Sequence, residues 1–375
     1  MATASPLPTI EQATIEQATI EQATIEKATI EQATIERATI ERATIEHVAT
    51  AAGVSVATVS RALRGLPNVA LATRARVEEV ARELDYRADP AASRLAAGRS
   101  RTIAVVVPLI NSWYFCNVVA GAEAVCAEEG YDLLVVTAPH GTSRRDVMAT
   151  AKALHRRVDG MIFVEVSLEP GDVDELRHRR LGVVTIGQVT GSYPAVRIDN
   201  VRIGAMATQH LLDLGHRRIG ILGAQAEDPA WFDVPGQRIE GVRRAMAAVG
   251  ARLDAGLVAE GEFTVDGGHH AAVALLRRPD RPSAIFALSD EMAFGAVIAA
   301  RELNLEVPGD LSLVGVDDHD VAQVVGLTTV RQRVVEHGAV AARALLRRLA
   351  GEPGVQGAVT SPPELVVRTS TRPPS

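Results

Sequence analysis

The feature that most constrains the fold is a series of short apolar runs after residue 102, separated by stretches with the spacing of amphipathic helices. A strand covered on both faces is apolar throughout, whereas a strand with one exposed face alternates between apolar and polar residues. Strands that alternate with helices form parallel sheets with helices on both sides. Seven runs are too many for one small sheet, so we predict an α/β core of two subdomains with a cleft between them. The runs occupy residues 103–107, 133–136, 161–164, 183–186, 219–222, 284–287 and 311–316.

Size and composition indicate a multidomain protein of the cytoplasm. The 375 residues exceed what one hydrophobic core organises, and a chain with 47% hydrophobic and 23% charged residues is typical of globular proteins. The two cysteines, Cys116 and Cys126, are too few for a disulfide framework. No apolar run approaches the ~18 residues of a membrane span. The N-terminus also lacks the pattern of a signal peptide. We therefore expect a cytoplasmic location and no membrane partner.

The start of the chain repeats Thr-Ile-Glu at intervals of five residues, from Thr9 to Thr44. This period turns successive Ile side chains by about 140° on a helix and places them on alternate faces of a strand, so neither element would have a continuous apolar face. We expect residues 1–43 to be a low-complexity extension, helical or disordered. The favoured interpretation is a tandem duplication of the start of the next domain, and the alternative is an additional interaction arm. A helical extension could run directly into the first helix of that domain.

Residues 44–88 have the pattern of three short helices. The first is followed by Gly53, which suits a tight turn, and the second begins after Ser55, a typical N-cap. Two short helices joined by a turn that contains glycine predict a helix-turn-helix unit, with an ordinary three-helix bundle as the alternative. The expected buried residues are Ile45, Val48, Ala49 and Ala52, then Val59, Ala62 and Leu63, then Val77, Val80, Ala81 and Leu84. The expected outward residues of the second helix are Ala57, Ser60, Arg61 and Arg64.

The distribution of charge favours DNA as a partner of this segment. The whole chain has a net charge of -7, but residues 44–101 contain nine arginines and six acidic residues, a balance of +3. A local cationic face is what attracts phosphates, whatever the total charge. Residues 89–101 then have Pro90 at the start and Gly98 near the end, as in a short hinge helix that is not stable alone. A passive linker is the alternative.

The motifs of this segment resemble the DNA-binding headpiece of the LacI family of bacterial transcription regulators. The matching residues are 44–49, 52–55, 58–63, 73–77 and 84–86. The resemblance implies the following DNA contacts: base reading by Val56, Ala57 and Arg61, phosphate positioning by Ser55, Thr58, Ser60 and Tyr86, and insertion of Leu95 into the minor groove. It also implies that the hinge folds when two copies pair on DNA. Two departures affect helix caps, because His47 replaces an acidic residue and Ala70 replaces a serine.

The remainder of the chain is similar to periplasmic sugar-binding proteins, as the cores of LacI-family regulators are. Matching motifs include residues 199–200, 211–219, 238–241, 289–295, 315–318 and 327–332. The resemblance implies an effector cleft lined by Arg238 and Asp317, with Asp199, Ser289 and Phe115 as further candidates, the last for stacking.

Two regions near this cleft limit what the resemblance implies. Leu109 and the run Trp113-Tyr114-Phe115 depart from the family at its first wall, so the identity of the effector does not transfer. Trp113 is equally expected to pack in the fold. Trp231 either closes the cleft or is a surface aromatic, which is the simpler interpretation.

Taken together, the resemblance implies a repressor with an α/β periplasmic-binding-protein-like core at residues 102–375. As a homodimer it would bind a pseudo-palindromic operator, under the control of a sugar-like or nucleoside-like effector. The alternative is a soluble sugar-binding receptor without a transcriptional role. We expect no enzyme activity, cofactor or metal, since no nucleophile elbow or phosphate loop occurs. His269 and His270 are adjacent and are therefore expected to point apart. Asp317 and Asp318 belong to the cleft motif.

Overall fold

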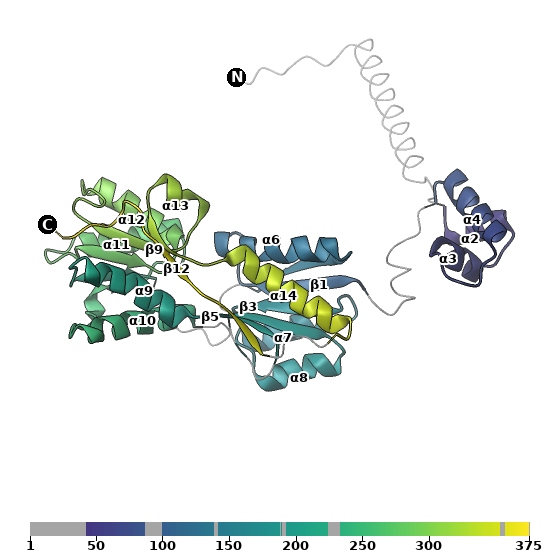
Figure 1. The fold of residues 1–375 in the computed structure, drawn as a ribbon, viewed down its shortest axis with the longest axis horizontal. Coiled ribbons are helices and arrows are strands. Elements are labelled where there is room, and N and C mark those ends of the chain that lie inside the picture. Colours follow the sequence, from purple (N-terminus) through teal and green to yellow (C-terminus); the bar gives the residue numbers. More distant parts are fainter. Residues whose placement is uncertain are drawn as a thin grey trace, which may run out of the picture. The chain divides into compact units, whose positions relative to one another are not determined.

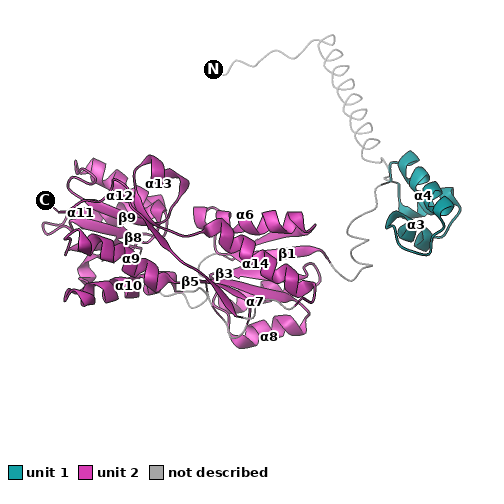
Figure 2. Ribbon diagram, viewed as in Figure 1, with its two compact units in different colours: residues 1–97 teal, residues 98–375 magenta. Residues whose placement is uncertain are grey.

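The computed structural model describes residues 43–86, 100–138, 142–187, 189, 193–223, 233–352 and 357–374. The chain divides into two compact units, Met1–Ala97 and Gly98–Ser375 (Figure 2). The predicted extension and nearly all of the predicted hinge, including Leu95, lie outside the described residues, as does Trp231. No helix in the described part of the chain is both long and apolar enough to cross a membrane.

The described part of the first unit is a small helical domain with the predicted turn. Its helices are α2 (Ile45–Ala52), α3 (Val56–Leu63) and α4 (Leu71–Glu83). Gly53 ends α2 in the left-handed conformation (φ 63°, ψ 36°), which glycine adopts without steric cost. The side chain of Ser55 caps α3 by accepting a hydrogen bond from the backbone N–H of Thr58 at 3.2 Å. The fully buried core residues come from all three helices, as expected: Val48, Ala49, Ala52, Val59, Ala62, Val77 and Ala81.

The ends of these helices differ from expectation at two places. Thr44 is extended (φ −98°, ψ 166°) and precedes α2 as its N-cap, so an uninterrupted helix from the repeat into α2 does not form. Leu84 is not part of the buried stripe, because α4 ends at Glu83 and Leu84 is 39% exposed at its C-cap. Nδ1 of His47 accepts a hydrogen bond from the backbone N–H of Thr44 at 3.4 Å, so an unprotonated imidazole nitrogen takes the place of the usual carboxylate. Ala70 leaves α4 without a side-chain cap.

The second unit contains two sheets, and the first is formed by residues at both ends of that unit (Figure 1). Its strands are β1 (Thr102–Val107), β2 (Asp132–Thr137), β3 (Gly160–Val164), β4 (Gly182–Gly187), β5 (Ala195–Ile198) and β11 (Ala358–Ser361). Among the described residues the order is β11-β5-β4-β3-β1-β2, with all neighbours parallel. Its helices are α6 (Trp113–Glu128), α7 (Arg144–Ala153), α8 (Pro170–His178) and α14 (Val334–Leu349).

Both faces of the first sheet are covered, which explains why its strands are apolar throughout. Ile103 and Val105 of β1 pack in one cluster with α6 and α14, whereas Ala104 and Val106 pack with α7 and α8 in another. Successive side chains of a strand point to opposite faces, so each face needs its own layer of helices.

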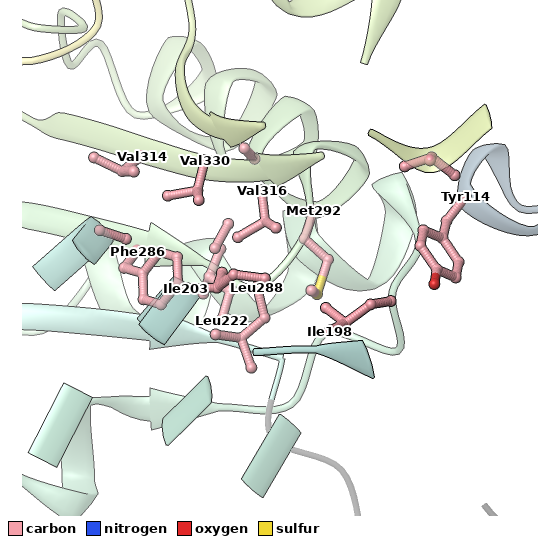
Figure 3. Close-up of a cluster of buried hydrophobic side chains, with 14 of the residues drawn as sticks. Tyr114, Ile198, Ile203, Leu222, Phe286, Leu288, Met292, Val314, Val316 and Val330 are labelled. Carbon is pink, nitrogen blue, oxygen red and sulfur yellow. The ribbon is translucent and has the colours of Figure 1, made fainter. Parts of the chain in front are cut away.

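The second sheet is similar but has an antiparallel edge. Its strands are β6 (Ile219–Leu222), β7 (Val258–Ala259), β8 (Ala284–Ala287), β9 (Ser312–Asp317), β10 (Thr328–Arg331) and β12 (Glu364–Val366). The order within the described residues is β12-β10-β9-β8-β6-β7, and only β12 is antiparallel to its neighbour. The helical segments of this part are α9 (Asn200–Asp213), α10 (Val234–Ala248), η1 (Ala255–Leu257), α11 (Val265–Leu276), α12 (Asp290–Glu302) and α13 (Asp320–Val324). Figure 3 shows part of the apolar cluster beneath this sheet, including Phe286, Leu222 and Met292.

The seven predicted strands all form, and the two-subdomain core is as predicted. The described chain passes between the sheets after β5, after β10 and between β11 and β12. The sequence pattern did not reveal β5, β7, β10, β11 or β12. β5, β10 and β11 have four residues, as β6 and β8 do, but they contain Arg, Thr or Ser and so form no continuous apolar run. β7 and β12 have only two and three residues.

Among the described residues, three pairs of helices are in contact at the backbone, and each helix of a pair contributes a glycine. In the pair α6 and α14, a Cβ atom on Gly121 would lie 1.9 Å from the carbonyl oxygen of Val335. A Cβ atom on Gly338 would lie 1.9 Å from the carbonyl oxygen of Val118. The other glycines of this kind are Gly204 and Gly241 in α9 and α10, and Gly268 and Gly295 in α11 and α12. Side chains at these crossings would force the helices apart.

Candidate functional site

The outer face of α3 has the exposure that a DNA-reading helix needs. Ala57 and Arg61 are exposed, and Val56 is 40% exposed although it is apolar. Arg61 and Arg64 make no ion pair with any other residue that the structure describes. A short apolar side chain at the start of the helix permits close approach to a groove, and an unpaired guanidinium can donate two hydrogen bonds to guanine.

The residues expected to position phosphates lie around the same helix start. Ser55 is exposed, whereas Thr58, Ser60 and Tyr86 are half-buried. The hydroxyls of Ser55 and Thr58 are 2.9 Å apart, so the cap of α3 holds both side chains in place. Tyr86 packs against the core of the first unit.

In the second unit, polar residues gather where parallel strands of both sheets end. Glu165 directly follows β3, Asp317 is the last residue of β9, and Gln332 directly follows β10. In parallel α/β folds, ligands bind beyond the carboxyl ends of the strands. Tyr114 of α6 and Asn200 and Arg238 of α9 and α10 join them. We call these residues the Arg238 cluster: Tyr114, Glu165, Asn200, Arg238, Asp317 and Gln332.

Arg238 is held at the centre of this cluster. It is only 4% exposed, its Nε donates to Oδ1 of Asn200 at 3.0 Å, and its Nη1 donates to the carbonyl oxygen of Leu288. Gly204 allows this position, because a Cβ atom there would lie 1.9 Å from the carbonyl oxygen of Arg238. The guanidinium is therefore oriented before any ligand binds, which lowers the entropic cost of binding.

Two carboxylates share the field of this single cation. Burial raises the pKa of Asp317 to about 7, although Arg238 and a hydrogen bond from Gln332 at 2.7 Å oppose the shift. Burial also raises the pKa of Glu165 to about 7, again opposed by Arg238 and by Tyr114. Both residues have a positive φ, 115° for Asp317 and 55° for Glu165, which costs energy for a side chain other than glycine. Strain and raised pKa values at one place are typical of functional sites.

Three buried polar atoms of the cluster have no hydrogen-bond partner among the residues that the structure describes. They are the hydroxyl oxygen of Tyr114, Nδ2 of Asn200 and Oε1 of Gln332. Glu165 nevertheless lies near enough to Tyr114 to contribute, after burial, to the raised pKa of the phenol. An unpaired buried polar atom costs about 1–3 kcal/mol, so a group that supplied the missing partners would bind favourably here.

A second set of polar contacts joins the two subdomains beside this cluster. Glu291 of α12 accepts hydrogen bonds from the hydroxyl of Ser112 at 3.4 Å and from the backbone N–H of Trp113 at 3.5 Å. The ring of Trp113 lies on that of His319, with centroids 4.9 Å apart. A carboxylate at the start of α6 is favourable for the helix dipole. Trp113 therefore packs between subdomains.

A hollow of about 560 Å³ opens next to these contacts, and its lining includes Trp113, Asp317, Gln332 and Arg343. Asp290 lies deeper, at 0% exposure, where it accepts hydrogen bonds from Thr329 and the backbone N–H of His319. Burial raises the pKa of Asp290 well above its usual value. Each carboxylate oxygen of Asp290 therefore has a hydrogen-bond partner within the fold, so Asp290 has a structural role.

The structure brings together two of the predicted effector residues, Arg238 and Asp317, and places the other three beside them. Asp199 and Ser289 are N-caps: Asp199 accepts from the backbone N–H of Arg202 at 2.9 Å, and Ser289 from that of Met292 at 3.3 Å. Phe115 is 9% exposed and lies in the apolar core against Tyr114. The hydroxyl of Tyr114, at the edge of the apolar cluster in Figure 3, is the polar group that this segment contributes.

Sequence reasoning missed Tyr114, Glu165, Asn200 and Gln332 as members of the cluster. A usable signal existed for Glu165, because it comes directly after the predicted strand at 161–164. Asn200 and Gln332 lie in the matched motifs 199–200 and 327–332, but the strand before Gln332 was not predicted, so neither residue was assigned to the cluster.

The expectation that His269 and His270 point apart is wrong. Asp266, His269 and His270 each offer a ligand atom, and these atoms all lie within 4.8 Å of one another. The two imidazole rings have centroids 5.3 Å apart. Adjacent helical residues diverge at Cβ, but His269 and His270 are at i+3 and i+4 from Asp266, so side-chain rotation can direct both imidazoles toward it.

Comparison with known proteins agrees with this arrangement. Residues 44–89 match the family described as bacterial regulatory proteins of the lacI family, and residues 208–371 match the periplasmic binding protein-like domain. The HTH-type transcriptional repressor CytR of Escherichia coli (strain K12) is 34% identical over 330 residues, which are 87% of this chain and 95% of that protein.

Solved structures give the same result for the fold. A complex of the transcriptional regulator CelR with cellobiose is 30% identical, with a TM-score of 0.62 over 88% of this chain and 100% of that chain. The lac repressor dimer bound to operator and the anti-inducer ONPF is 24% identical and shares the fold, with a TM-score of 0.76 over 88% of this chain and 100% of that chain. These relatives are transcription regulators and not enzymes. The chain therefore belongs to the LacI family of bacterial transcription regulators.

Proposed function

We propose that this regulator is a repressor of the cytoplasm that binds a pseudo-palindromic operator as a homodimer. Its affinity for that operator is controlled by a sugar-like or nucleoside-like effector in the Arg238 cluster. In this proposal residues 44–88 read DNA, residues 89–101 form a hinge, and residues 102–375 bind the effector and dimerise. Residues 1–43 are an extension that takes no part in operator recognition.

Support for the DNA-reading role comes from the exposed side of α3. Val56, Ala57 and Arg61 would contact bases, while Ser55, Thr58, Ser60 and Tyr86 would place the phosphate backbone. Leu95 of the hinge would enter the minor groove at the centre of the operator. Val56 and Arg61 are both exposed, so in this proposal both side chains are free to contact base edges.

The observation that carries the effector proposal is the unsatisfied polar chemistry around Arg238 and Asp317. Within the described residues, Nδ2 of Asn200, Oε1 of Gln332 and the hydroxyl of Tyr114 lack a hydrogen-bond partner, although Glu165 lies near Tyr114. These atoms surround a fixed guanidinium and two carboxylates. Sugars and nucleosides carry several hydroxyls, each of which donates and accepts. The structure of the relative CelR in complex with cellobiose supports a ligand of this class. Phe115 lies in the core, so in this proposal it supports Tyr114 from behind.

The coupling follows from the location of the cluster between subdomains. Residues of both sheets contribute to it, so a ligand that contacts both would stabilise one arrangement of the subdomains over another. A change in that arrangement would alter the spacing of two hinges in a dimer, and therefore the spacing of two headpieces on DNA.

The decisive experiment uses Arg238→Ala with Arg244→Ala as the matched control. Both residues lie on α10, but Arg244 is exposed and pairs with Glu240 on the same helix. The wild-type protein is screened by thermal shift against neutral sugars and nucleosides, since a bound ligand at about 100 times its dissociation constant adds about 2.7 kcal/mol of stability. Arg238→Ala should lose both this shift and the effect of the ligand on operator binding. Its operator affinity without ligand should stay within a few-fold of wild type.

Arg244→Ala should behave as wild type in both assays. A full ligand response in Arg238→Ala would remove Arg238 from the effector site. A protein that binds sugar but does not discriminate its operator from random DNA would instead be a sugar receptor without a transcriptional role.

A further inference from the structure

A group of potential metal ligands lies on α11 and shares no residue with the Arg238 cluster. Asp266, His269 and His270 occupy positions i, i+3 and i+4 of this helix. Their ligand atoms all lie within 4.8 Å of one another, and Nδ1 of His270 is 3.5 Å from Oδ2 of Asp266. Side chains at these spacings share one face of a helix.

A second helix provides a carboxylate for the same group. Oε2 of Glu302, the last residue of α12, lies 2.9 Å from Nε2 of His269. In metal sites, a ligating histidine is commonly oriented by a carboxylate that binds its second ring nitrogen. Glu302 is in the position for this role.

The scaffold beneath the group is rigid. α11 and α12 are in backbone contact, because a Cβ atom on Gly295 would lie 2.4 Å from the backbone nitrogen of His269. His269 therefore belongs to a helix crossing that cannot close further, which fixes Glu302 relative to it. By contrast, the side chains of Asp266 and His270 are 86% and 72% exposed and are free to rotate.

We propose that Asp266, His269 and His270 form a binding site for a divalent transition-metal ion of the zinc class, with Glu302 as a positioning residue. Two imidazoles and a carboxylate are a ligand set that Zn²⁺ and Ni²⁺ accept, whereas Mg²⁺ and Ca²⁺ prefer oxygen ligands alone. Three protein ligands leave the remaining coordination position to solvent.

The separation of the ligand atoms is compatible with this proposal. Bond lengths of about 2.1 Å place two tetrahedral ligands roughly 3.4 Å apart, which is shorter than the separation of up to 4.8 Å in the ion-free arrangement. Rotation of the exposed Asp266 and His270 side chains brings their ligand atoms to this shorter separation. The positive end of the α11 dipole disfavours a cation, and the carboxylates of Asp266 and Glu302 compensate for it.

The site is tested with full-length protein prepared without a histidine tag, titrated with ZnCl₂ in an isothermal calorimeter. The expected result for wild type is saturable binding of one ion per chain at neutral pH. Asp266→Asn, His269→Ala and His270→Ala should each weaken binding about ten-fold or more, and Glu302→Gln should weaken it about 10- to 100-fold. Affinity should fall in acid, because imidazole binds a metal only when unprotonated.

His178→Ala is the control, since His178 is an exposed helical histidine elsewhere in the second unit. Its zinc affinity should equal that of wild type, and thermal unfolding of every variant without zinc verifies that each one folds. Absence of saturable binding in wild type would overturn the proposal. Unchanged binding in both histidine variants, or an equal loss in His178→Ala, would also overturn it.

Discussion

Single residues of this regulator show how burial determines what a charge can do. Arg238 and Asp317 are both nearly inaccessible, yet two hydrogen bonds hold Arg238 in place, whereas Asp317 accepts one hydrogen bond from Gln332. Arg61 is the opposite case, since it is exposed and makes no ion pair with any residue that the structure describes. A cation that the protein leaves unpaired is available to DNA.

Replacement of Arg61 tests base reading at the residue scale. Arg61→Ala should weaken operator binding by about 1–3 kcal/mol and relax the base preference at one position of each half-site, because a bidentate contact to guanine is lost. Dissociation constants for the operator and for a random duplex are measured at the same salt concentration.

Arg82→Ala is the control for this change, because Arg82 is exposed on α4 and paired with Glu79. It should leave the base preference unchanged. If Arg61→Ala weakened binding to operator and random DNA by equal factors, Arg61 would contact phosphate and not base.

At the scale of elements, the second unit is built from helix pairs that touch at the backbone. Each pair has a glycine on both helices, and in each case the facing atom of the partner helix is backbone and cannot move aside. Such contacts fix the distance between helices more strictly than side-chain packing does. One of these glycines, Gly204, also determines where Arg238 lies.

The crossing of α6 and α14 provides the test at this scale. Gly338→Ala should reduce the free energy of unfolding by about 1–3 kcal/mol, because the new methyl group overlaps the carbonyl of Val118 and the helices must separate. Gly171→Ala is the control, since no atom of a neighbouring residue lies within 4 Å of a Cβ there. It should be neutral or stabilising by up to about 1 kcal/mol. Equal effects of both changes in urea denaturation would show that the crossing tolerates separation.

At the scale of the whole molecule, the second unit contains buried carboxyl groups, and burial favours their protonated form over the charged form. Burial raises the pKa of Asp317 and of Glu165 to about 7, so between their ordinary pKa values and about 7 the folded state holds more protons than the unfolded state. The free energy of unfolding therefore falls as pH rises through this range and levels off above it. Burial lowers the pKa of His337 to about 4, which acts in the opposite direction below neutral pH.

Asp317→Asn isolates one part of this dependence. Asparagine keeps the acceptor for Gln332 and tolerates a positive φ, but it does not ionise. The free energy of unfolding of the variant minus that of wild type should increase by about 2–3 kcal/mol as the pH rises from about 5 to about 8. The contribution of His337 is present in both proteins and cancels. Parallel stability curves for the two proteins would contradict the raised pKa of Asp317.

Much of the architecture follows from local pattern alone. The turn at Gly53, the cap at Ser55 and the seven strands formed by apolar runs were all predictable, because each depends on the conformational preference or polarity of residues close in the chain. Arg238 and Asp317 were assigned to an effector cleft because of the resemblance. The remaining strands are very short or contain polar residues, as β10 does with two threonines and an arginine, so β10 was not predicted and Gln332 was not placed beside the cluster.

The sequence by itself determined the three helices of the first unit and seven of the described strands, and that one short helix presents an arginine on its outer face. Only the tertiary structure decided the order of the strands, and therefore that Glu165, Asn200 and Gln332 meet around Arg238 from distant parts of the chain. It also decided that His269 and His270 converge on Asp266. The physical reason is the separation of the interacting residues along the chain. Periodicity and caps depend on residues close in the sequence, whereas a site assembles through strand pairing and helix crossing between distant segments.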